Sequence, residues 1–245
     1  MEALLNALKT LRLSGIARTL PMRLQEAKAN ELDYRDFLDR LVTDELQCRK
    51  DNLLNRRLKA AQLPALKTLD EFDFAFNPGI SKKLLNELAS VRFVHQAHNI
   101  LFIGPPGIGK THLSIALAIA AIHAGYPVFY RSAFDLVQDM ADAARNDTRK
   151  KLVSQYVQYR LLVVDEFGMK KMPPNAADDF LEIIHRRYGH TATIIATNRP
   201  IEDWSVILGD TAAASAILDR FLDNAEIISL KGAKSFRMGR KTNKE

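Results

Sequence analysis

The chain has little cysteine and no long uncharged apolar run, and both absences limit what it can be. Its 245 residues include a single cysteine, Cys48, so no internal disulfide can form and a reducing compartment is favoured. No stretch approaches the roughly 18 uncharged apolar residues of a transmembrane helix. The N-terminus also lacks the basic start and continuous apolar core of a signal peptide. We therefore expect a cytoplasmic protein that does not enter the membrane.

Metal-binding spacing, internal repeats and low-complexity tracts are also absent. The six histidines are scattered, and none pairs with cysteines or carboxylates at the spacing of a zinc site. A structural zinc site is therefore not expected.

Positive charge is concentrated in two segments. Residues 76–230 hold 16 basic and 16 acidic residues, whereas 46–67 and 231–245 each hold six basic residues and one acidic residue. Basic segments of this kind suggest an anionic polymer partner, most often nucleic acid. The same charge also suits a solvated helix face and a frayed tail, so charge alone leaves both interpretations open.

Apolar periodicity divides the chain into a helical part and an alternating part. It predicts helices at 3–20, interrupted by Pro21, and at 33–62. The predicted organisation is a helical N-terminal domain at 1–66, a linker at 67–79 and an α/β domain at 80–245.

In the α/β domain, helical patterns alternate with short apolar runs. The predicted strands are 100–103, 127–131, 161–165, 192–196 and 226–230, and the predicted helices are 81–97, 110–124, 133–145, 148–159, 175–188 and 212–222. This alternation predicts a parallel sheet with helices on both faces.

A phosphate-binding loop follows the first predicted strand. Residues 104–111 read GPPGIGKT and fit G-x-x-x-x-G-K-[ST], between a strand and a helix. Glycines let backbone N–H groups turn inward around an anion, and the helix adds its positive N-terminal end. Lys110 would reach the β- and γ-phosphates, and the Thr111 hydroxyl would bind Mg²⁺. The predicted nucleotide-binding residues are Gly104, Pro105, Pro106, Gly107, Ile108, Gly109, Lys110, Thr111 and His112.

Two later strands end in polar residues that suit phosphate cleavage. Residues 161–166, LLVVDE, form an apolar strand that ends in two acids, the Walker B pattern. Asp165 would hold the Mg²⁺ shell, and Glu166, on the other side by strand alternation, would orient an attacking water. Asn198 follows the next strand and would bridge the water and the γ-phosphate, although asparagine is also common in turns. Arg220 and Arg237, taken alone, are typical of surface charges.

Together these motifs resemble the AAA+ ATPases, and within them the subgroup of DnaA and the DnaC helicase loader. The resemblance extends to the IstB family of transposition helper proteins and covers most of the chain. It rests on six segments in the family's order: LKTLRLSGIARTLPMRL, RLKAAQLPALKTLDEFDF, GPPGIGKTHL, VVDEFG, ATNRP and AILDRF.

The resemblance implies a role for each matched residue. Lys110, Thr111 and Asp165 would bind ATP and Mg²⁺, and Glu166 the water. Asn198 would be the sensor 1 residue, Arg220 an arginine finger projected into a neighbouring subunit, and Arg237 a sensor 2 contact.

The resemblance also implies an architecture and an assembly. The implied fold is an AAA+ core preceded by a small all-helical domain. Only 47 residues follow Asn198, so the helical lid would be reduced or absent. The helical insertion at 133–159 resembles one that favours open spirals.

The function implied is an ATP-dependent helper that assembles head-to-tail on duplex target DNA and recruits or regulates a transposase. A DnaC-like replicative helicase loader is the alternative. A GTPase is disfavoured because the chain has no Asn-Lys-x-Asp motif after the relevant strand. A metabolic kinase is disfavoured by Glu166 beside Asp165.

Overall fold

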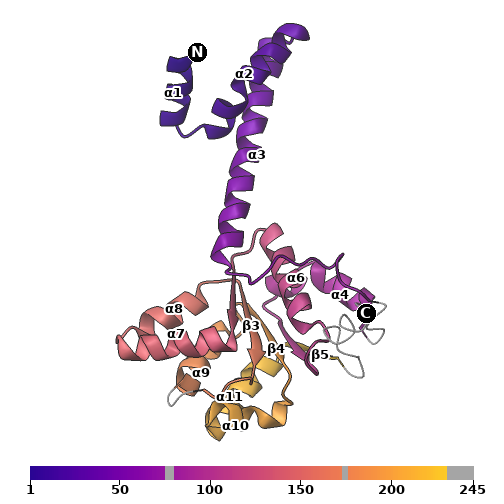
Figure 1. Ribbon diagram of the computed structural model, residues 1–245, viewed down its shortest axis with the longest axis vertical. Helices are drawn as coiled ribbons and strands as arrows, with labels where there is room; N and C mark the ends of the chain where they lie inside the picture. The colour runs from indigo at the N-terminus through magenta and orange to yellow at the C-terminus, as the bar shows by residue number, and fades with distance from the viewer. Residues whose placement is uncertain (75–79, 173–175, 231–245) are drawn as a thin grey trace, which may run out of the picture. The chain divides into compact units, whose positions relative to one another are not determined.

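The structure, a computed structural model, describes residues 1–74, 80–172 and 176–230. Its contacts divide the chain into two compact units, Met1–Arg57 and Leu58–Glu245 (Figure 1). The domain boundaries given above, with a linker at 67–79, stay a prediction.

The first unit is helical. It contains α1 (Glu2–Thr10), α2 (Ser14–Ala29) and most of α3 (Tyr34–Ala60), which extends past the unit's last residue. The prediction of one helix at 3–20 that stops at Pro21 is wrong, because α2 runs through Pro21. The break comes earlier, where Arg12 has a left-handed φ of 58° and the Leu13 amide donates to the Leu8 carbonyl at 2.9 Å. These contacts satisfy the carbonyls at the end of α1, as in a Schellman motif.

A buried carboxylate joins α2 to α3. Glu45 of α3 is 5% exposed, and its Oε2 accepts from the amides of Gly15 at 2.6 Å and Ile16 at 3.2 Å. Its Oε1 accepts from Arg49 Nε at 2.7 Å. The first amides of a helix lack partners within the helix, so Glu45 supplies α2 with the cap that its own sequence does not provide.

Gly15→Ala is expected to destabilise the first unit by about 1–3 kcal/mol, the usual cost of overpacking. A Cβ at Gly15 would lie 2.7 Å from Glu45 Cα and 2.8 Å from Cys48 Cβ, so the two helices would have to separate. The measurement is denaturant unfolding followed by circular dichroism. Ala29→Val, at the exposed end of α2, is the control and should unfold like wild type. Equal stability of Gly15→Ala would contradict the close approach.

The second unit is a five-stranded parallel sheet in the order β2-β3-β4-β1-β5. Its strands are β1 (Asn99–Ile103), β2 (Val128–Ser132), β3 (Leu161–Phe167), β4 (Ala192–Thr197) and β5 (Ala225–Ser229). Its helices are α4 (Lys82–Ala89), α5 (Arg92–His95), α6 (Lys110–His123), α7 (Ala133–Arg145), α8 (Arg149–Val157), α9 (Ala176–Arg187), η1 (Ile201–Asp203), α10 (Trp204–Leu208) and α11 (Thr211–Leu222). The predicted parallel sheet with helices on both faces is confirmed.

Two local predictions differ from the structure. The single helix predicted at 81–97 is two helices, because Val91 has a left-handed φ of 56° and ends the first one. The short helical segments η1 and α10 were not predicted, since they are too brief to show periodicity. The insertion between β2 and β3 does contain two helices, α7 and α8.

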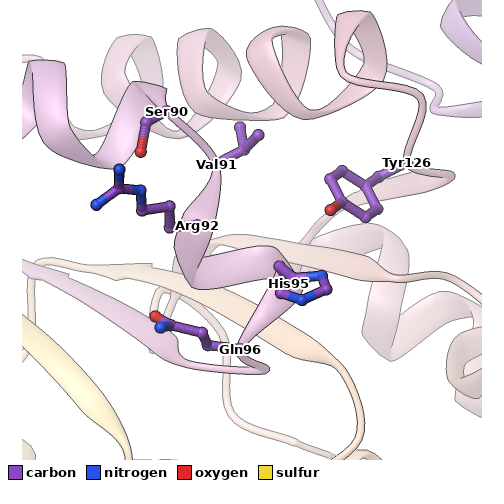
Figure 2. A pocket seen from close by; sticks show the side chains of 6 residues that line it. All are labelled: Ser90, Val91, Arg92, His95, Gln96 and Tyr126. Carbon is purple, nitrogen blue, oxygen red and sulfur yellow. The ribbon is translucent and has the colours of Figure 1, made fainter.

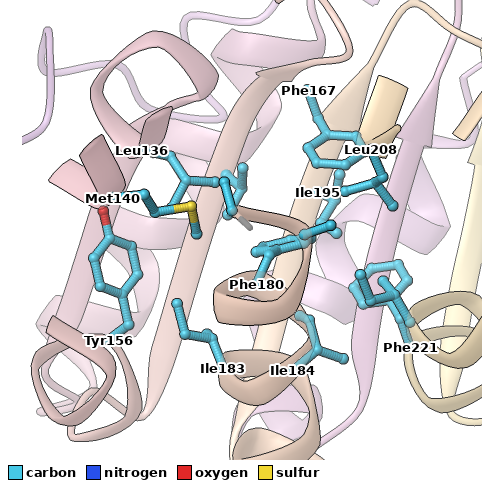
Figure 3. Packing of buried hydrophobic residues seen from close by; sticks show 14 of the residues in the cluster. Leu136, Met140, Tyr156, Phe167, Phe180, Ile183, Ile184, Ile195, Leu208 and Phe221 are labelled. Atoms are coloured by element: carbon cyan, nitrogen blue, oxygen red, sulfur yellow. The ribbon is translucent and has the colours of Figure 1, made fainter. Parts of the chain in front are cut away.

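The main core lies between the sheet and the helices from α7 to α11. Figure 3 shows Leu136 and Met140 of α7, Phe180 and Ile183 of α9 and Phe221 of α11 gathered over the sheet. Strand residues Leu162, Val164 and Ile195 complete this face. Val163 and Asp165 alternate with them and therefore point to the other face, where α6 contacts β3 and β4.

In the part of the chain that the structure describes, every helix is too short or too polar to cross a bilayer.

Candidate nucleotide site

The predicted nucleotide-binding and catalytic residues follow three neighbouring strands at one edge of the sheet. The phosphate loop at 104–109 follows β1, Asp165 and Glu166 lie at the end of β3, and Asn198 follows β4. Because β4 lies between β3 and β1 and the strands are parallel, all three ends meet at the carboxyl edge. This is where open α/β sheets bind ligands.

The phosphate loop wraps around its own lysine. Lys110 Nζ donates to the carbonyls of Gly104 at 2.7 Å and Pro105 at 2.8 Å. Gly109 caps α6 with a left-handed φ of 104°. A Cβ at Gly109 would lie 2.6 Å from Phe72 Cε2, so only glycine fits there.

The segment before the first strand packs on this loop, which the sequence did not predict. His112 Nε2 lies 2.7 Å from the Thr68 carbonyl oxygen, and the rings of His112 and Phe72 meet edge to face at 5.3 Å. Thr68 and Phe72, which fall within the predicted linker, therefore contact the phosphate loop and the start of α6. The aromatic spacing of EFDF was the available signal.

A β-bulge separates the two acids of β3. Val164 pairs with Ile195, but Phe167 pairs with Thr197, so two residues of β3 face one residue of β4. Glu166 is exposed and takes a left-handed φ of 56°, a strained geometry for a residue with a Cβ. Phe167 holds the bulge, because its ring is buried against Trp204 at 4.5 Å. Asp165 is buried and Glu166 is exposed, but the bulge interrupts the simple strand alternation from which we predicted their opposite directions.

Asp165 is nearly enclosed, at 2% exposure. Its Oδ2 accepts from the Tyr130 hydroxyl at 2.8 Å, and its Oδ1 accepts from the Glu166 amide at 2.8 Å. Burial, together with the charge of Asp165, raises the pKa of Tyr130 above its usual value, so the hydroxyl keeps its proton and donates. Sequence reasoning missed Tyr130, because a tyrosine in an apolar strand normally belongs to the hydrophobic core. Its contact with Asp165 depends on the register between β2 and β3.

The end of β4 is tied to both neighbours. Thr197 Oγ1 donates to the Phe167 carbonyl at 2.7 Å, and the Gly104 amide donates to the Thr197 carbonyl at 3.2 Å. Asn198 Nδ2 lies 3.1 Å from Met169 Sδ, while Asn198 Oδ1 is buried and has no hydrogen-bond partner among the described residues. That oxygen is an acceptor without a donor, as expected of a group that meets a ligand or water.

Arg220 is not at this edge. Arg220 lies in α11, where its Nε donates to His185 Nδ1 at 3.1 Å and its Nη1 to the Ala216 carbonyl at 2.9 Å. The next residue, Phe221, accepts from the Asn99 side chain at the start of β1, opposite the phosphate loop. Arg237 lies outside the described residues.

The residues present fit ATP and Mg²⁺. Lys110 is an ammonium whose Nζ lies within the phosphate loop, where it can form charge-assisted hydrogen bonds to phosphate oxygens. Mg²⁺ usually takes one or two protein ligands, waters and nucleotide phosphates. Thr111 and Asp165 suit such a partial site. Within the described ranges, no cluster of three or more His, Cys, Asp or Glu residues could hold a metal ion by itself.

A separate cavity of about 490 Å³ opens near the amino ends of the strands. Figure 2 shows Arg92, His95 and Gln96 on one side of it and Tyr126, from the turn before β2, on the other. It contains no predicted site residue and lies at the opposite edge of the sheet from the phosphate loop.

Solved structures share this fold. AMPPCP-bound DnaA from Aquifex aeolicus matches with a TM-score of 0.59 and 22% identity, over 75% of this chain and 56% of that one. The match thus spans about half of the DnaA chain. The DnaC helicase loader matches with a TM-score of 0.54 and 22% identity, over 72% of this chain and 99% of that one. At such identities these matches show the AAA+ fold alone.

Sequence relatives are much closer. An insertion sequence IS21 protein of Pseudomonas aeruginosa, named for ATP binding, is 37% identical over 241 residues, 98% of this chain and 89% of the relative. Its counterpart in insertion sequence IS5376 of Geobacillus stearothermophilus is 35% identical over 94% of this chain and 92% of the relative. A family model described as IstB-like ATP binding protein matches residues 6–244. The chain therefore belongs to the IstB-like family of ATP-binding proteins.

Proposed function

We propose that this protein hydrolyses ATP to control its assembly on duplex DNA, and that the assembly recruits or regulates the transposase of its insertion sequence. The observation that carries the proposal is the carboxyl edge of the sheet. There a phosphate loop, a buried carboxylate and an exposed carboxylate follow neighbouring strands, with Asn198 between them. Insertion-sequence relatives supply the context.

The residues divide the chemistry among them. Lys110 would bind the β- and γ-phosphates, while Thr111 and Asp165 would hold Mg²⁺, which neutralises charge that develops on the phosphates. Glu166 would orient the attacking water and accept its proton. Asn198, whose buried Oδ1 can accept a hydrogen bond, would position the same water. Loss of the γ-phosphate would then release contacts that hold an interface between subunits.

The basic part of α3 supports DNA as the surface for assembly. Lys50 and Arg56 are exposed and Arg57 is half-buried. Within the described ranges no side chain partners any of these three. Point charges without interleaved aromatic residues suit duplex phosphates better than stacked single strands.

Duplex DNA binding is expected to weaken roughly tenfold or more between low and moderate salt, because several phosphate contacts release counterions. Fluorescence anisotropy with a generic duplex measures this. Replacing Lys50, Arg56 and Arg57 together by Gln should weaken binding and flatten its salt dependence. The control replaces Lys83, Lys150 and Lys151 by Gln, with the same charge change elsewhere, and should bind like wild type. Salt-insensitive binding, or none, would remove DNA from the proposal.

The proposed assembly and its client are tested directly. Light scattering after size exclusion should show large complexes only when ATP and duplex DNA are both present. Pull-down should capture the transposase of the same insertion sequence and leave the replicative helicase behind. Capture of the helicase instead would make this protein a helicase loader and overturn the transposition part of the proposal.

A further inference from the structure

Tyr130 forms hydrogen bonds to Asp165 of β3 and to Ala61, the residue that follows α3. Tyr130 lies in β2, one of the two edge strands of the described sheet. On the inner side of β2, Tyr130 is in register with Val163, two residues before Asp165. Its ring spans that offset on the face shared with Asp165, and the hydroxyl donates to Asp165 Oδ2 at 2.8 Å. Tyr130 is 6% exposed, so its packing fixes the direction of this donor.

The outer side of β2 is occupied by residues that directly follow α3. The Tyr130 amide donates to the Ala61 carbonyl at 2.9 Å, and Arg131 Nη1 donates to Gln62 Oε1 at 2.6 Å. Ala61 is fully buried, and Arg131 is itself held by Asp139 at 2.9 Å. Ala61 and Gln62, which follow α3, are therefore hydrogen-bonded to the strand that carries Tyr130.

We propose that Tyr130 is a positioning residue for the metal-binding carboxylate of Asp165, and that through it the junction after α3 at Ala61–Gln62 controls metal affinity at the nucleotide site. This inference rests on the proposed function, since it requires Asp165 to hold the Mg²⁺ of bound ATP. With one oxygen of Asp165 fixed by Tyr130 and the other by the Glu166 amide, the carboxylate is oriented before the metal arrives. Outer hydrogen bonds of this kind commonly contribute 10- to 100-fold to metal affinity.

The same contacts give the junction a route to the site. Movement of Gln62 would shift Arg131, and with it the edge strand. Lys50, Arg56 and Arg57 lie on α3. DNA bound to that helix would therefore alter Mg²⁺ binding at Asp165 through the hydrogen bonds of Arg131 and Tyr130.

Tyr130→Phe removes only the hydroxyl and tests the positioning role. Binding of a fluorescent ATP analogue should be unchanged without Mg²⁺. The Mg²⁺ concentration that gives half-maximal tightening of that binding should rise about tenfold, and saturating Mg²⁺ should restore both binding and turnover. The matched control is Tyr188→Phe, which removes an exposed tyrosine-to-carboxylate hydrogen bond, to Asp223 at 2.6 Å, away from the site. It should leave the Mg²⁺ midpoint alone.

Gln62→Ala tests the route. It should raise the Mg²⁺ midpoint by severalfold in the wild-type background and by nothing further in the Tyr130→Phe background, since interacting residues are non-additive. An unchanged midpoint in Tyr130→Phe overturns the positioning role. A Gln62→Ala shift that adds fully to the Tyr130→Phe shift, or is absent, overturns the route. Wild type that binds the analogue without any response to Mg²⁺ would instead refute the metal role in the proposed function, and the inference with it.

Discussion

Glu166→Gln is expected to bind ATP as tightly as wild type and to hydrolyse it at least about 100-fold more slowly, the usual contribution of a general base. The amide has nearly the shape of the carboxylate but cannot take the proton of the attacking water. Glu166 is exposed on its bulge, so the substitution leaves the core intact. Phosphate release measures turnover, and a fluorescent analogue measures binding.

Three comparisons sharpen this result. Lys110→Ala should lose ATP binding itself, because Lys110 is the cation of the phosphate loop. Glu87→Gln, an exposed acid on α4, should behave like wild type. If assembly on DNA requires ATP, Glu166→Gln should also stay in large DNA-bound complexes by light scattering. Turnover at the wild-type rate in Glu166→Gln would show that this acid is only a surface charge.

The candidate site could be predicted where a short segment of sequence contains its functional residues. GPPGIGKT directly follows an apolar strand and LLVVDE ends one in two acids, and parallel strands bring such ends to one edge. That reasoning required no knowledge of strand order. The structure confirms the parallel sheet, and it places Asn198 directly after β4, the strand that lies between β3 and β1.

The parts that were missed depend on contacts between distant segments. Tyr130 meets Asp165 only because β2 pairs with β3 in one register, and no local pattern records that register. Phe72 reaches Gly109 from a segment that reads as a linker. Pro21 does not end a helix, because α2 runs through it. The break comes at Arg12, which has a left-handed φ although it is not a glycine, so the sequence does not mark it.

Arg220→Ala is expected to bind ATP normally and to hydrolyse it about a thousandfold or more slowly, because an arginine finger stabilises the charge of the phosphoryl-transfer transition state. The fold argues that it serves a neighbouring subunit. Phe221, next to Arg220, accepts a hydrogen bond from Asn99 at the start of β1, whereas the phosphate loop begins after Ile103 at its end. These ends lie about 13 Å apart at the usual rise of a strand. The guanidinium of Arg220 is hydrogen-bonded to His185 of α9. It therefore does not approach the phosphate loop of its own subunit.

A mixture of two inactive variants decides between a finger in trans and a purely local role. Arg220→Ala retains Glu166 in its pocket, and Glu166→Gln retains Arg220 for its neighbour. In a head-to-tail assembly with random mixing, roughly a quarter of the interfaces would hold both working groups, and part of the activity should return. Arg186→Ala is the matched control, since it removes an exposed arginine that pairs with Glu182 on the same helix, and it should keep wild-type turnover. If the two inactive variants assemble together by light scattering and yet hydrolyse nothing, Arg220 does not act across the interface, and its loss must work through the packing of α11 on α9 instead.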